Sequence, residues 1–283
     1  DINIDVLHSS LGGVITGLTR LQKNKRIIFT EGDDDIAYLK AMNEAFKRVN
    51  SPLAIDFSKI SFWYIRGKDN MNLKIMANKQ LLSQAVQGCK YAVIFDKDYS
   101  TEAANTKFIN SDILRRLGNS SWAHTHNGYC IESVLFSEMD KLKKFLNKIT
   151  GKDEETINTF LDEYFYELKQ SLSNVQSNIY FNMKEKFKSQ KKPTRPELDN
   201  VEFDIYAGEA AQNIHYAMNK DNIRAFVLKI EEEWGITLFQ REDDASETFA
   251  SGLLNKYIDS IEAADDIYND YVILFQKIRD FIV

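Results

Sequence analysis

Short apolar runs alternate with helical patterns over the first half of the chain. Four runs have the length and the β-branched and aromatic content of strands: 26–32, 60–67, 91–98 and 121–127. The stretches between them space their apolar residues as helices do: 33–49, 70–87 and 107–117. Strands that alternate with helices form parallel βαβ units, with helices on the faces of one sheet. The pattern therefore predicts an α/β fold, with a parallel sheet flanked by helices.

Beyond residue 138 the strand pattern largely disappears. Amphipathic stretches predict helices, including 160–172, 221–234 and 262–282. The basic segment 184–197 ends in prolines and predicts a loop or hinge, and 201–208 could form a brief strand. We therefore expect two domains: a sheet-forming domain over residues 1–137, and a mostly α-helical domain over 138–283. The second would serve substrate binding, dimerisation or partner docking.

Acidic residues follow three of the four predicted strands. Glu31 and Asp35 come after the first strand, Asp96 and Asp98 after the third, and Glu132 after the fourth. Because parallel strands present their carboxyl ends at one edge of the sheet, these carboxylates should converge. Carboxylates at close range repel, and a divalent cation removes that cost. Oxygen ligands suit Mg²⁺ or Mn²⁺, and two such ions could activate a water for phosphoryl transfer.

A simpler interpretation is that acids after strands cap the next helix. We expect Asp33 and Asp34 to have this structural role. The three acidic groups together, in this order on a parallel sheet, indicate a metal site more strongly than any one of them.

The arrangement resembles the Toprim domain of topoisomerases, primases and several small nucleases. The resemblance covers 26–137 and rests on an EGxxD strand end (Glu31 to Asp35), followed some 60 residues later by a DxD strand end at Asp96 and Asp98. Glu132 in an IE helix start and the glycine turn at 66–70 resemble the OLD-type nuclease branch. A Toprim core with a helical C-terminal half and no fused ATPase is similar to the AriB-like effectors of the PARIS anti-phage defence system.

That resemblance implies a metal-dependent endonuclease. It implies that metal ions are held at the scissile phosphate by five acids: Glu31, Asp35, Asp96, Asp98 and Glu132. Lys68 or Lys97 could neutralise charge in the transition state, and Lys68 is favoured because Lys97 should point to the other side from its neighbouring aspartates.

The resemblance also implies a toxic defence effector that is held inactive by an ABC/SMC-like ATPase partner. RNA, with transfer RNA as one option, is favoured over DNA as the substrate, although OLD-type relatives cut DNA. The alternative is a catalytically silent docking or nucleic-acid-binding subunit of an ATPase complex. A different phosphoryl-transfer enzyme would need residues that handle nucleoside triphosphates, and the chain has no GxxxxGK[ST] motif.

Charge is unevenly distributed along the chain. Residues 201–283 contain 17 Asp and Glu against 7 Lys and Arg, whereas 1–200 contain 25 against 29. The first two thirds are therefore the better candidate for contact with a polyanion. A basic run could follow a phosphate backbone, with aromatic residues interleaved, or could be a solvated helix end: Lys184, Lys186, Lys188, Lys191, Lys192 and Arg195.

The remaining features are less specific. His124 and His126 face the same side of a strand, where they could support the site or form a hydrogen-bonded pair.

The apolar side of the last helix could form a homodimer interface or complete the helical core: Ile273, Leu274, Phe275, Ile278 and Phe281. Cys89 and Cys130 lack metal-ligand spacing, and no apolar run or leader suggests a membrane or export, so we expect a cytoplasmic protein.

Overall fold

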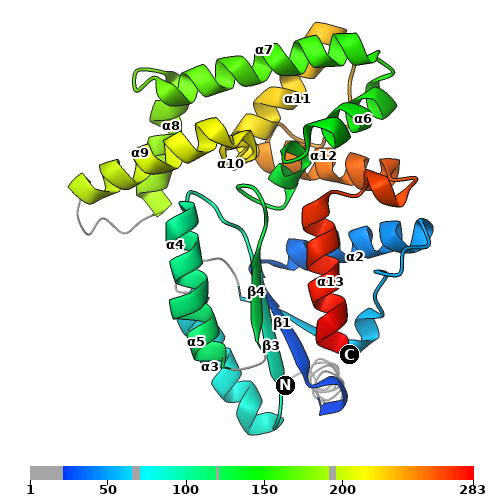
Figure 1. Ribbon diagram of the computed structural model, residues 1–283, viewed down its shortest axis with the longest axis vertical. Coiled ribbons are helices and arrows are strands. Elements are labelled where there is room, and N and C mark those ends of the chain that lie inside the picture. The colour runs from blue at the N-terminus through cyan, green and yellow to red at the C-terminus, as the bar shows by residue number, and fades with distance from the viewer. Residues whose placement is uncertain (1–21, 66–70, 119–120, 191–195) are drawn as a thin grey trace, which may run out of the picture.

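A four-stranded parallel sheet forms the lower half of the molecule (Figure 1). The computed structural model describes residues 22–65, 71–118, 121–190 and 196–283. The strands lie in the order β2–β1–β3–β4, with these bounds: β1 Arg26–Thr30, β2 Ser61–Tyr64, β3 Lys90–Phe95 and β4 Trp122–Thr125. Their parallel register brings the carboxyl ends of all four strands to one edge.

Helices cover both faces of this sheet, which is why the strands are apolar on both sides. Ile27 and Phe29 of β1 pack into one apolar cluster, whereas Ile28 between them packs into another on the opposite face. The helices of this half and its two short 3₁₀ turns are α2 Asp33–Arg48, α3 Met71–Ala85, α4 Glu102–Lys107, the π-helical η2 Phe108–Leu114, α5 Arg115–Leu117, η1 Phe57–Lys59 and η3 Glu132–Phe136.

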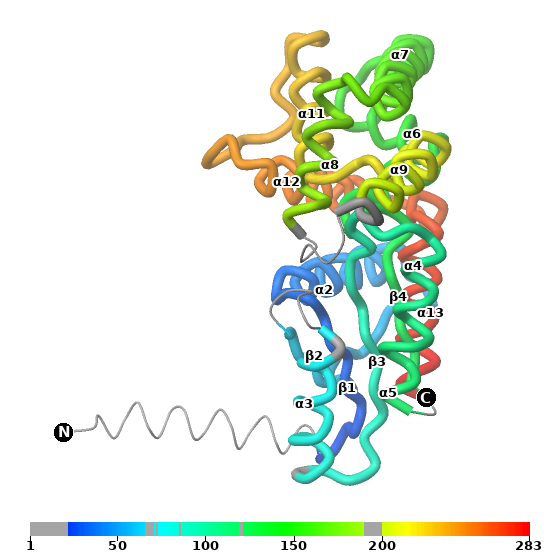
Figure 2. The backbone as a smooth tube through the Cα atoms, turned by 90° about the vertical axis from the view of Figure 1, so that its left-hand side faces the viewer, coloured from blue at the N-terminus to red at the C-terminus, as the bar shows by residue number. Residues whose placement is uncertain are grey.

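The rest of the described chain is helical. Its elements are α6 Met139–Thr150, α7 Glu154–Ser173, α8 Asn178–Gln190, α9 Pro196–Gln212, α10 Ile214–Ala217, α11 Lys220–Trp234, α12 Ser246–Ser260, the 3₁₀ turn η4 Ala264–Asp266 and α13 Asn269–Ile282. Helices α6 to α12 stand beyond the carboxyl edge of the sheet, and α13 returns along the sheet beside β4 (Figures 1 and 2). The Phe281 ring of α13 lies 5.8 Å from that of Trp122 on β4.

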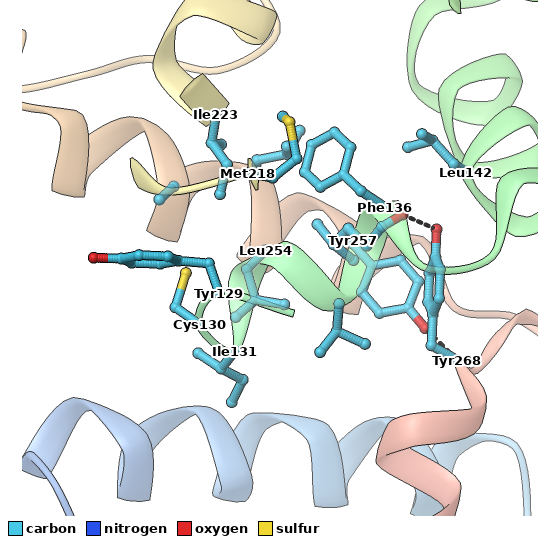
Figure 3. Close-up of a cluster of buried hydrophobic side chains, with 14 of the residues drawn as sticks. Tyr129, Cys130, Ile131, Phe136, Leu142, Met218, Ile223, Leu254, Tyr257 and Tyr268 are labelled. Atoms are coloured by element: carbon cyan, nitrogen blue, oxygen red, sulfur yellow. Dashed lines mark hydrogen bonds between the residues drawn. The ribbon is translucent and has the colours of Figure 1, made fainter. Parts of the chain in front are cut away.

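The two halves share one apolar core. It runs from Ile28 of β1 through Phe136 of η3 to Phe226 of α11. Figure 3 shows Tyr129, Cys130 and Ile131, from the segment after β4, in the same buried cluster as side chains of the helical half. This packing fixes the segment that carries Glu132.

The predicted fold class is confirmed: a parallel sheet is flanked by helices, and the C-terminal half is mostly helical. The expected strand at 201–208 is wrong, because these residues lie inside α9, where Phe203, Tyr206, Ala207 and Ala210 are buried at helical spacing. The loop expected from residue 184 is also wrong up to Gln190, since α8 continues to that residue. The domain boundary at residue 137 stays a prediction.

The apolar side of α13 faces the protein's own core. Leu274, Phe275, Ile278 and Phe281 are buried, and only Ile273 of the five predicted residues is exposed. Completion of the helical core therefore accounts for four of them. Within the described residues, no helix has the length and apolar content that crossing a membrane requires.

Candidate metal centre

The turn after β1 positions Glu31 and Asp35. Glu31 follows the last residue of the strand, and Gly32 is the N-cap of α2. The Asp35 carboxylate accepts a hydrogen bond from the Gly32 N–H at 2.8 Å, so it folds back toward the turn beside Glu31. Asp33 and Asp34 are exposed in the first turn of α2, where negative charge favours the helix N-terminus.

The segment after β3 positions Asp96 and Asp98. The Asp96 carboxylate accepts a hydrogen bond from the Ile131 N–H at 3.2 Å. Asp98 has a left-handed backbone (φ 52°), which aspartate tolerates better than most residues, and its N–H donates to the Tyr129 carbonyl at 2.8 Å. These two bonds join the segment after β3 to the one after β4.

Lys97, between the two aspartates, is directed away from them. Its ammonium group is buried, pairs with the Glu102 carboxylate and lies 3.3 Å from the centre of the Tyr216 ring. Lys97 therefore holds the segment after β3 against Glu102 and Tyr216. Lys68, the other predicted cation, lies outside the described residues.

Glu132 begins η3 with a side chain that is only 1% exposed. Its Oε2 is buried and accepts no hydrogen bond among the described residues. Its Oε1 lies 3.9 Å from the Nζ of Lys220. A buried carboxylate oxygen without a donor is costly, and a cation would offset that cost.

The other four predicted acids act electrostatically on Asp96. Burial, and then the carboxylates of Asp35, Asp98, Glu31 and Glu132, raise the pKa of Asp96 well above its usual range. Repulsion of this kind places the four carboxylates in the neighbourhood of Asp96. Burial likewise raises the pKa of Asp35, against the hydrogen bond from Gly32.

Among the described residues Lys220 is a cation that faces this cluster, and the sequence did not predict it. It is the first residue of α11, and its Nζ contacts the two carboxylate oxygens of Glu247 at 2.6 and 2.5 Å. Burial alone would lower the pKa of Lys220, but the carboxylates of Glu132 and Glu247 raise it above its usual range. Lys220 therefore stays charged beside the acids.

The start of α11 is tied to the loop after β3. Asn219, the N-cap of α11, accepts the Asn222 N–H at 2.9 Å and donates to the Tyr99 hydroxyl at 3.1 Å. Tyr99 follows Asp98 in the chain. An Asn-Lys-Asp-Asn sequence predicts a helix start, but nothing in it predicts that this start faces the sheet.

The basic run is only partly described. Lys184 pairs with Asp204 at 3.8 Å, while Lys186 pairs with Asp221 and Lys188 with Glu185. Lys191, Lys192 and Arg195 lie outside the described residues. Among the interleaved aromatic residues Tyr180 and Phe187 are buried, and Phe181 is exposed.

His124 of β4 and His126, which follows the strand, share a buried partner on α13. Nε2 of His124 lies 3.3 Å from Oδ1 of Asp270, and Nδ1 of His126 lies 3.3 Å from Oδ2. Burial alone would raise the pKa of Asp270, but the hydrogen bonds from the two histidines hold that pKa below its usual range. Burial, above all, lowers the pKa of His124. The sequence indicated a paired role for the histidines but not the aspartate that joins them.

Comparison of the chain with protein-family models, curated proteins and solved structures found no match.

Proposed function

We propose that this chain is a divalent-metal-dependent endonuclease that hydrolyses phosphodiester bonds in nucleic acid. The observation that carries the proposal is that four carboxylates act on the buried carboxylate of Asp96 at the carboxyl edge of a parallel sheet. Ligands bind at this edge in open α/β sheets. The cluster repels itself when no cation is bound, so binding a cation is its most direct use.

The donor set fits Mg²⁺ or Mn²⁺. All five side chains offer carboxylate oxygens, which hard cations prefer, and five carboxylates are enough to hold two ions. The buried Oε2 of Glu132, which accepts no hydrogen bond from the described residues, is a suitable ligand atom. Oδ2 of Asp35 already accepts a hydrogen bond from the Gly32 N–H, so Asp35 would bind a metal ion through its other carboxylate oxygen.

The carboxylates and Lys220 would have different roles in phosphodiester hydrolysis. Bound Mg²⁺ would supply charge neutralisation and a water of lowered pKa. Glu31, Asp96, Asp98 and Glu132 would orient the phosphate through the ions. Lys220, held by Glu247, would stabilise the negative charge that develops on the phosphate oxygens.

The substrate class and the biological role rest on the Toprim resemblance. We propose RNA, with transfer RNA as one option, ahead of DNA, and a role as a toxic effector of anti-phage defence. An ABC/SMC-like ATPase would hold the chain inactive, and a homodimer would be the active form. The basic run of α8 would contact the substrate only by exchanging its internal acidic partners for phosphates, as with Lys186 and Asp221.

The test is cleavage of separate pools of transfer RNA, ribosomal RNA, plasmid and single-stranded DNA with Mg²⁺. Glu31→Gln should abolish cleavage, because it removes a ligand and keeps the size of the side chain. Glu44→Gln is the matched control, since Glu44 is exposed on α2 and pairs only with Lys47 among the described residues. Cleavage of one pool that is lost with EDTA and with Glu31→Gln would support the proposal and identify the substrate class.

The ATPase partner must be included if the isolated chain cleaves none of the pools. No cleavage with the activated partner present, together with no Mn²⁺ binding by calorimetry, would refute the nuclease proposal. The chain would then be a docking or nucleic-acid-binding subunit.

A further inference from the structure

A second cluster of ligand-type side chains lies outside the proposed nuclease chemistry. His124 lies on β4 and His126 follows the last residue of that strand, so the two side chains alternate with Thr125 and project to the same side. Asp270, in the first turn of α13, meets them there. The cluster joins two segments that are distant in the sequence, at the point where the C-terminal helix begins to pack on the sheet.

The spacing of the three side chains is longer than that of ordinary hydrogen bonds. Oδ2 of Asp270 lies 3.4 Å from Nε2 of His124 and 3.3 Å from Nδ1 of His126. Typical N–H···O bonds measure about 2.7–3.2 Å. Zinc bonds of about 2.0–2.1 Å instead place neighbouring ligand atoms of a tetrahedron roughly 3.3–3.4 Å apart. The three ligand atoms all lie within 4.8 Å of one another.

The donor types differ from those of the Asp96 cluster. Two imidazole nitrogens and one carboxylate oxygen suit a borderline ion such as Zn²⁺, whereas Mg²⁺ prefers oxygen alone. The same donors bind Fe²⁺ in oxygenases, but such sites keep open positions for substrate. Here the side chains of His124, His126 and Asp270 are 4%, 1% and 7% exposed. Their burial favours a structural ion.

We propose that His124, His126 and Asp270 bind one Zn²⁺ ion, which joins the end of β4 to the start of α13. A water would complete the tetrahedron. This site uses other side chains than the carboxylates around Asp96, although the charge of His126 acts on Asp35. The proposal does not depend on the proposed nuclease function.

Lys277 opposes binding and provides a sharp test. Its Nζ lies 3.5 Å from Nδ1 of His124. Nδ1 of His124 faces the Lys277 ammonium group, and Nε2 faces the Asp270 carboxylate. When Zn²⁺ binds Nε2, the ring proton moves to Nδ1 and faces the ammonium group. Lys277 must then turn away, and removal of its charge should strengthen zinc binding.

The experiment is a zinc titration of the full chain after chelator treatment, in competition with a chromogenic chelator. The wild type should bind one Zn²⁺ at this site. His126→Asn should weaken that binding by more than about 100-fold, because loss of even an outer partner costs metal sites roughly 10- to 100-fold. Glu31→Gln, which alters only the carboxylate cluster, should leave it unchanged, and Lys277→Met should tighten it.

Two results would overturn the proposal. The first is no zinc binding by the wild type. The second is zinc binding that Glu31→Gln removes and His126→Asn retains, which would assign the ion to the carboxylate cluster. Circular dichroism checks whether His126→Asn folds. If it does not fold, the test is the zinc affinity of Lys277→Met. An affinity equal to that of the wild type would contradict the assignment.

Discussion

Replacement of Asp96 by asparagine should stabilise the metal-free protein while it abolishes activity. Burial and four neighbouring carboxylates raise the pKa of Asp96 well above its ordinary value of 3.8. Asparagine has the same size and can still accept the hydrogen bond from the Ile131 N–H. The variant therefore keeps the local packing and loses the charge that is repelled.

The magnitude follows from proton linkage. The pKa of Asp96 is higher in the folded state, so above pH 3.8 the folded state binds more protons and stability falls as the pH rises, until the raised pKa is passed. One such proton costs about 1.4 kcal/mol per pH unit. Since 1 kcal/mol shifts Tm by about 2 °C in a chain of this length, wild type and Asp96→Asn should diverge by roughly 3 °C per pH unit.

Urea unfolding in EDTA at about pH 5, 6 and 7 measures this difference. Addition of Mg²⁺ at 100 times its Kd should then stabilise the wild type by about 2.7 kcal/mol and the variant much less. Glu44→Gln, which removes an exposed charge from α2, should change stability by less than about 0.5 kcal/mol at every pH. Equal pH slopes for wild type and Asp96→Asn would refute the reasoning, because burial and the neighbouring carboxylates would then not raise the pKa of Asp96 in the folded state.

Three further variants test other parts of the molecule. Lys220→Met should lower kcat by about 10²- to 10³-fold with little change in KM, as measured under saturating Mg²⁺, and an unchanged kcat would remove Lys220 from the chemistry. Gly128→Ala should cost about 1–3 kcal/mol in urea unfolding and weaken Mn²⁺ binding, because its Cβ would lie 3.0 Å from Ser133 beside Glu132. Phe226→Ala should cost about 3–5 kcal/mol in urea unfolding, since the ring is fully buried among four aromatic neighbours, and a loss below 1 kcal/mol would contradict that packing.

The sheet and its acids were predictable because their signals are local. Each strand is a short apolar run, and Glu31, Asp96 and Glu132 each follow such a run within a few residues. The parallel order of the strands then places their ends at one edge without further information. Periodicity failed at 201–208 because Val201 and Ile205 are apolar but exposed, and they obscure the stripe of buried residues on the other side of the helix.

The groups contributed by the C-terminal half were not predictable in this way. Lys220 lies in the acidic last third of the chain, where its neighbours give no sign of a site. Asp270 begins a helix, and an acid at that position has an ordinary role at a helix N-terminus. Only the tertiary packing shows that Lys220 faces Glu132. The same holds for Asp270, which faces His124 and His126.

The site is therefore built from both halves of the chain, and this bears on how the helical half is understood. Residues 1–137 alone would keep all five carboxylates but lose the ammonium group of Lys220, which lies between Glu132 and Glu247. Asn219, which positions that lysine, donates to Tyr99 beside Asp98. Without the charge of Lys220, the carboxylates would repel one another more strongly and would be less fixed in position. The helical half thus contributes to the electrostatics of the proposed centre itself, in addition to any contact that it makes with a substrate or a partner.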